Sequence, residues 1–88
     1  MPGFSLAQES VVVEKSVVCA RTNIVLETLK ETYKEEPVWL GNGNDRSRYS
    51  IFVNPKNGQF TIVQFNHEVA CILGAGNSSV NIPIKPTL

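Results

Sequence analysis

Cys19, Cys71 and His67 are the side chains of this sequence best suited to covalent or metal chemistry. Cys19 precedes a predicted helix and Cys71 lies within the last predicted strand, so packing of helix on sheet could bring the two sulfur atoms together. A disulfide there would close a long loop and stabilise the fold by roughly 4 kcal/mol. Two separate buried thiols, packing as small apolar groups, stay open as the alternative. A thiolate at Cys19, made reactive by the N-terminus of the following helix, is the weakest interpretation.

His67 is the only histidine, and with Cys71, Glu68 and Cys19 it can be drawn as a metal site or as a Cys-His nucleophile pair. In an extended strand, however, His67 and Cys71 stand ~13 Å apart, which is too far for one ion. No second ligand pair has the spacing of a zinc site. We therefore expect a water-exposed turn histidine, with no metal and no cofactor.

Three polar motifs are too incomplete to define a site. The loop 42–45 lacks the alternating acids and distant glutamate of a calcium loop, and 74–76 is too short a glycine stretch to bind phosphate. The glycosylation sequon at 77–79 matters only in a secreted eukaryotic protein. No catalytic residue is predicted, and we expect the protein not to be an enzyme.

A change of hydrophobic period at Thr22 predicts the helix that would position these residues. Val25, Leu29 and Tyr33 recur at four-residue spacing with charged residues on the other face, which is typical of an amphipathic helix. Thr22 is the expected N-terminal cap. Pro37 is expected to end the helix, because a residue before proline is pushed out of helical geometry.

Alternating apolar residues predict the strands. The surest element is a hairpin from Arg48 to Phe65, whose two strands flank the turn residues 54–58. A further strand is expected at 69–73 and a short extended segment at 38–40. The β-branched stretch 10–19 favours a short strand, or an arm that joins a neighbour's sheet.

These elements predict an α+β fold, with one N-terminal helix packed on a three- to four-stranded antiparallel meander sheet. At 88 residues the chain has room for a single domain, 1–88. We expect a flexible lead at 1–9, a core at 10–76 and an extended, proline-bearing C-terminal arm at 77–88.

Composition excludes two classes of partner. Eight basic and eight acidic residues cancel, so the net positive field that drives nucleic-acid binding is missing. No apolar run approaches the ~18 residues of a membrane span, so no membrane insertion is expected. Residues 1–10 do not resemble a secretory signal. The compartment therefore depends on the cysteines: periplasmic or secreted if the disulfide forms, and otherwise cytoplasmic.

Aromatic residues supply the best functional indication. In the predicted strands they fall on alternate sides of the sheet, so one helix cannot cover all of them. The candidate interaction surface consists of Trp39, Tyr49, Phe52, Phe60 and Phe65. The leading hypothesis is a non-enzymatic protein-interaction or assembly module, whose partner is another protein or itself in a homodimer formed through a sheet edge or swapped arm. The alternative is a small-ligand or lipid-binding module with a pocket between helix and sheet.

From Cys19 to Gly76 the chain has a cysteine before a helix, a helix exit from Tyr33 to Pro37-Val38, and then the segments Phe60-Thr61-Ile62-Val63 and Ala70-Cys71-Ile72-Leu73-Gly74-Ala75-Gly76. This order resembles a group of small uncharacterised bacterial proteins, mostly proteobacterial and often exported. Those proteins more usually have tryptophan where Phe60 stands and glycine where Glu68 stands. The resemblance implies a domain of unknown function with paired cysteines, and so supports the disulfide. It implies no activity, and a small phage or environmental relative is consistent with it.

Overall fold

The described part of the chain contains one helix and five strands. They follow one another as β1 (Val18–Arg21), α1 (Thr22–Glu31), β2 (Glu36–Asn42), β3 (Arg48–Val53), β4 (Phe60–Phe65) and β5 (Val69–Gly76). The structure is a computed structural model that describes residues 10–83. The predicted lead at 1–9 and the last residues of the predicted C-terminal arm, 84–88, lie outside the described residues.

The strands form a single antiparallel sheet in the order β1-β5-β4-β3-β2. The α+β class and the antiparallel meander are confirmed, but the expected strand number of three to four is wrong. The segment predicted at 38–40 is the centre of a full strand, β2, that pairs along β3. A fifth strand, β1, joins the far side of β5.

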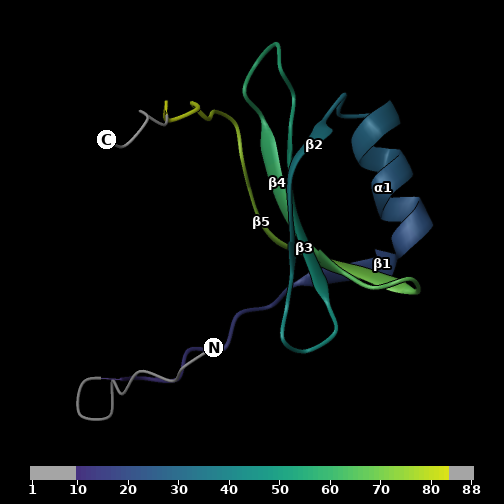
Figure 1. Cartoon of the computed structure of the whole chain (residues 1–88), viewed down its shortest axis with the longest axis vertical. Helices are drawn as coiled ribbons and strands as arrows, with labels where there is room; N and C mark the ends of the chain where they lie inside the picture. The colour runs from purple at the N-terminus through teal and green to yellow at the C-terminus, as the bar shows by residue number, and fades with distance from the viewer. Residues whose placement is uncertain (1–9, 84–88) are drawn as a thin grey trace, which may run out of the picture.

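The β-branched stretch 10–19 is not a strand over most of its length. Only Val18 and Cys19 belong to β1, and residues 10–17 are exposed and have no regular secondary structure. Side chains such as Val12 favour a strand through packing on a pleated surface with neighbours. Here Val12 is exposed and has no such surface. Figure 1 shows the segment leading away from β1, and the segment contacts the sheet through a hydrogen bond from Lys15 Nζ to the Leu73 carbonyl of β5 at 2.9 Å.

The helix α1 is shorter than predicted and is not capped by Thr22. Arg21 occupies the N-cap position without a side-chain cap. Thr22 is instead the first helical residue, and its hydroxyl donates to the carbonyl of Asn66 at 2.7 Å, which ties the helix to the β4–β5 turn. The helix ends before Pro37 because Lys34 takes a left-handed φ of 57°. The Glu35 N–H then reaches back to the Leu29 carbonyl at 2.9 Å and closes the exit.

The core lies between α1 and one face of the sheet. β1 and β2 occupy opposite edges, so the helix that joins them crosses that face. Val25 and Leu29 of α1 form one buried cluster with Phe52, Val63 and Ala70 of the strands. Figure 1 shows α1 on one side of the sheet. No helix in residues 10–83 is long and apolar enough to cross a lipid bilayer.

The β3–β4 hairpin matches its predicted position, and its turn is fastened to the helix exit. Asn54 is buried, and its side-chain oxygen accepts from the N–H groups of Lys56 and Asn57. Its side-chain nitrogen donates to the Tyr33 carbonyl at 2.9 Å. Gly58 supplies the positive φ of 77° that the turn needs. One amide side chain thus links the turn of the hairpin to the end of α1.

Candidate functional site: the open face of the sheet

The face of the sheet opposite α1 is apolar. Phe52 and Val63 point toward the helix, so the residues that alternate with them lie on the other side. The strand register joins these residues into rows across the sheet, for example Trp39 beside Ile51 and Ile51 beside Ile62. We call this surface the open face; its large side chains are Trp39, Tyr49, Ile51, Val53, Phe60 and Ile62.

Of the five aromatics predicted to form an interaction surface, three lie on the open face: Trp39, Tyr49 and Phe60. Phe52 is buried in the core and Phe65 packs against that core, so neither belongs to the open face. Both residues lie on the same side of the sheet as Val63, and α1 covers that side. Sequence reasoning missed the aliphatic centre of the open face, Ile51 and Ile62. Their alternation with buried residues was the signal that could have found them.

The rings of Trp39 and Phe60 lie close to the backbone of neighbouring glycine residues. A side-chain carbon at Gly41 would clash with the ring of Trp39, and one at Gly76 would come within 2.5 Å of the Phe60 ring. Gly41 follows Trp39 on the same face of β2, and Gly76 is the cross-strand partner of Phe60. The missing side chains let both rings lie close to the backbone. The result is a level apolar surface rather than one with projecting rings.

Edge strand β2 adds three consecutive exposed apolar residues. Val38, Trp39 and Leu40 are 60%, 53% and 56% exposed. Trp39 faces the open face, Leu40 pairs with Ser50 on the other side, and the register shifts at Val38. Large apolar side chains in consecutive, half-exposed positions are more typical of a contact surface than of a solvated edge.

Polar groups border the apolar centre at the end where the β2–β3 loop lies. The Asp45 carboxylate accepts from the Tyr49 hydroxyl at 3.4 Å and from Gln64 Nε2 at 3.3 Å. The Ser47 N–H also donates to the Asp45 carboxylate. This hydrogen bond is the main cause of the lowered pKa of the Asp45 carboxyl group. Desolvation, followed by the charge of Asp45, raises the pKa of Tyr49. An apolar centre with a hydrogen-bonded polar border is the usual anatomy of a protein interface.

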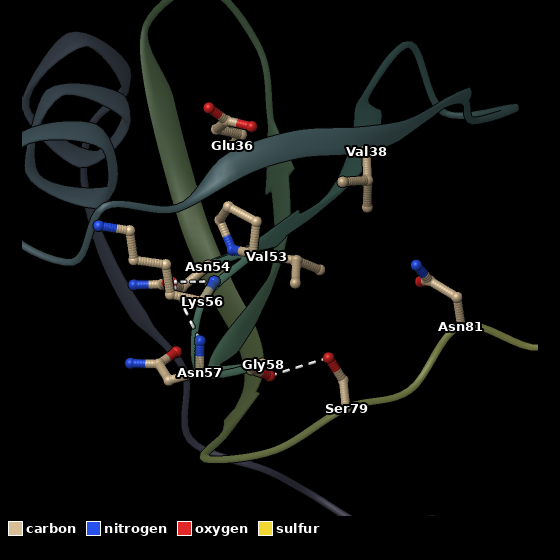
Figure 2. A pocket seen from close by; sticks show the side chains of 10 residues that line it. Glu36, Val38, Val53, Asn54, Lys56, Asn57, Gly58, Ser79 and Asn81 are labelled. Atoms are coloured by element: carbon tan, nitrogen blue, oxygen red, sulfur yellow. Dashed lines mark hydrogen bonds between the residues drawn. The ribbon is translucent and has the colours of Figure 1, made fainter.

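The opposite end of the open face is hollowed. A depression of about 440 Å³ lies between the start of β2, the β3–β4 turn and the C-terminal segment. Figure 2 shows its labelled lining residues: Glu36, Val38, Val53, Asn54, Lys56, Asn57, Gly58, Ser79 and Asn81. The Ser79 hydroxyl donates to the Gly58 carbonyl at 2.8 Å, and no histidine is among the residues that line the hollow.

The two cysteines form a disulfide that lies on the open face. Cys19 is directly opposite Cys71 in the β1–β5 register, and the Sγ atoms are bonded at 2.07 Å. The alternative of two buried thiols is wrong, because Cys19 is exposed and Cys71 is partly exposed. The bond also removes the thiolate that a reactive Cys19 would need.

His67 lies in the β4–β5 turn, as expected, and is exposed. Its Nε2 is 3.1 Å from the Glu68 carboxylate, which is itself exposed. Cys71 is bonded to Cys19 and cannot act as a nucleophile beside it. Among residues 10–83 no group of three or more histidine, cysteine, aspartate or glutamate side chains could hold a metal ion.

Glu35 is a further functional candidate that sequence reasoning overlooked. Its side chain is 2% exposed, and neither carboxylate oxygen has a hydrogen-bond partner. Burial raises its pKa, and the neighbouring Thr61 hydroxyl offsets part of that shift. Glu35 also lines a cavity of about 640 Å³ between the end of α1 and β2, together with Leu26, Pro37 and Phe52 and the charged residues Lys30, Glu31, Lys34 and Glu36.

Comparison with known proteins yields no match: no family model, no curated protein and no solved structure corresponds to this chain. The open face and the Glu35 cavity are therefore interpreted from their own chemistry.

Proposed function

We propose that this protein is a non-enzymatic protein-interaction module whose docking surface is the open face. The observation that carries the proposal is the level apolar surface formed by Trp39, Phe60 and Ile62 on the side of the sheet opposite α1. Trp39 is 53% exposed and Phe60 and Ile62 are partly exposed, and apolar surface left in contact with water is costly unless a partner covers it. The polar groups around Asp45 and Gln64 would then form the border of the contact.

The charge of the open face supports a protein partner over a nucleic acid. Aromatic platforms that stack bases lie in a positively charged groove that follows the phosphates. Among the strand residues of the open face, the register places only one cation, Arg21, and one anion, Glu36. The Cys19–Cys71 bond in turn supports an oxidising compartment for the module, such as the periplasm or the cell exterior.

Photo-crosslinking tests this function. Benzoylphenylalanine is placed at Trp39 or Phe60 in the full chain, with Tyr33 as the matched control, because Tyr33 is 44% exposed yet lies at the helix exit. Crosslinking in the producing cell, followed by mass spectrometry of the joined peptides, should show the same partner segment from both open-face positions and none from Tyr33. Crosslinks to nucleic acid, or no adduct at either position, would contradict the proposal.

The Glu35 cavity favours a second candidate, a module that binds a small amphipathic ligand. Leu26, Pro37 and Phe52 line about 640 Å³ beside the buried carboxyl group of Glu35, and four further charged residues complete the lining: Lys30, Glu31, Lys34 and Glu36. An amphipathic ligand would fit a lining of this mixed chemistry. Native mass spectrometry of freshly purified protein checks it. A bound molecule that is lost in a Phe52→Trp variant, which fills the cavity, supports this function, and an unliganded mass opposes it.

A further inference from the structure

We propose that the occupant of the open face is a second copy of this chain, packed face to face about a twofold axis that lies between the two sheets. The proposal rests on the proposed function and names its partner. Three features of the molecule carry it: the level surface, the protection of both sheet edges, and the positions of the two charged strand residues of the open face.

The level surface suits sheet-on-sheet packing. Two sheets pack with their strand planes ~10 Å apart, which requires that side chains of one face interdigitate without tall projections. The rings of Trp39 and Phe60 lie over Gly41 and Gly76, so the largest side chains of the open face stay low. The aliphatic Ile51 and Ile62 fill the space between them. A copy of the same surface is therefore a fitting partner in shape.

Both edges of the sheet are protected against pairing with another strand. β2 contains Pro37, which lacks an N–H group, and its register shifts at Val38, where a bulge interrupts the ladder. At the other edge, β1 has only four residues, so it offers a short ladder to another strand. Extension of the sheet from edge to edge is thus disfavoured, and contact through the face is the route that remains.

The two charged residues that the register places on the strands of the open face stand at opposite corners. Glu36 pairs with Val53 at the end of the sheet where the β3–β4 turn lies. Arg21 pairs with Val69 at the opposite end of the sheet, beside the β4–β5 turn. β1 and β2 are the two edge strands, so the corners are diagonal. A twofold axis at about 45° to the strands places Arg21 of each copy over Glu36 of the other. The strands of the two sheets then cross at about 90°, which is one of the two preferred arrangements of packed sheets.

The size of the open face sets the expected affinity. Five strands at ~4.8 Å spacing, with about six residues each at ~3.3 Å, span roughly 20 Å by 20 Å. Side-chain relief raises the accessible area above this flat footprint. Specific interfaces bury about 600 Å² or more per partner, so an interface formed by the open face would be among the small ones. A dimer with micromolar affinity is expected.

Sedimentation equilibrium of the full oxidised chain, from about 1 µM to about 500 µM, covers the affinities expected of an interface of this size. The wild type should form dimers, and Trp39→Lys should weaken the dimer at least tenfold. Tyr33→Lys is the matched control and should leave association unchanged, with far-UV circular dichroism showing that both variants are folded. A wild type that stays monomeric throughout, or dimers that tolerate Trp39→Lys, would overturn the proposal.

A charge exchange tests the arrangement of the two copies. Arg21→Glu and Glu36→Arg should each weaken the dimer several-fold, because each places like charges opposite one another. Combining them in one chain should restore the affinity, and failure to restore it would overturn the diagonal arrangement. If the purified protein is monomeric while positions 39 and 60 crosslink to a different protein, the second copy is excluded and the docking function stands.

Discussion

Glu35 has the least favourable surroundings of any acidic side chain in the described residues. A buried polar group without a partner costs about 1–3 kcal/mol, and more when it is charged. Both oxygens of Glu35 lack a hydrogen bond, and burial raises the pKa of the carboxyl group above its ordinary value of 4.5. The folded state therefore prefers the neutral acid. Its contribution to stability is fully present below pH 4.5 and is lost as the pH rises through the folded-state pKa.

Replacing Glu35 by glutamine should remove this pH dependence. The Glu35→Gln protein keeps the shape of the side chain but cannot ionise, so its advantage over the wild type should grow with pH, by about 1.4 kcal/mol for each unit by which the pKa is raised. Urea unfolding at a series of pH values measures the difference. Glu27→Gln on the exposed side of α1 is the control and should track the wild type. If the unfolding free energies of Glu35→Gln and the wild type differ by the same amount at every pH, Glu35 does not titrate as described.

Gly41 is expected to control the position of the Trp39 ring. An added methyl group in Gly41→Ala would occupy the space of the ring, which must then swing away from the sheet. Trp39 is the only tryptophan, so its fluorescence reports the change directly, and we expect a shift of emission to longer wavelength. Gly74→Ala is the matched control, because a carbon there would only reach ordinary contact with Ile62 at 4.0 Å. Identical spectra for the two variants would count against a ring seated on Gly41.

Individual residues were predictable from sequence where their chemistry is local. His67 lies in an exposed turn because the residues around it favour a turn, and the hairpin alternation separates Tyr49 and Phe60 from Phe52 and Phe65. Which of these two sets faces the helix depends on packing, so all four were included in the predicted surface. The burial of Glu35 depends on the left-handed turn at Lys34, which propensity does not indicate.

Among the elements, β1 is expected to depend most on a single bond. Its four residues are all exposed, and the Cys19–Cys71 disulfide joins it to β5 at the centre of their pairing. The Cys19→Ser/Cys71→Ser protein should lose about 2–4 kcal/mol of stability in urea unfolding. Hydrogen exchange should show faster exchange in β1, while the β3–β4 pair stays protected. Chemically reduced wild type should behave as the double variant does, and unchanged exchange in β1 would contradict this role.

The elements also show where sequence patterns stop being informative. The hairpin from Arg48 to Phe65 is defined by its own alternation and turn residues, and it was predicted closely. β1 and β2 are edge strands whose lengths are set by the strands beside them. The valines at 11–13 have strong strand propensity but no neighbouring edge, whereas Pro37 and Gly41 have weak propensity yet belong to β2 because β3 pairs with them.

At the scale of the whole molecule, one short helix faces a sheet of five strands. The buried apolar cluster of the described residues has only five members, Val25, Leu29, Phe52, Val63 and Ala70. Cores this small supply only about 3–5 kcal/mol, and small domains commonly gain further stability from disulfides or association. The Cys19–Cys71 bond is one such source here, and covering the open face would be the second.

The thermal midpoint should therefore rise with protein concentration. When folding is coupled to dimer formation, each tenfold rise in concentration adds about 0.7 kcal/mol per protomer, which is a few degrees for a domain of this size. Differential scanning calorimetry of the oxidised wild type over two decades of concentration measures the effect. Trp39→Lys should give a midpoint independent of concentration, since it breaks the contact but leaves the core of Val25 and Phe52 in place. A wild-type midpoint that does not move would mean that the chain folds without covering its open face.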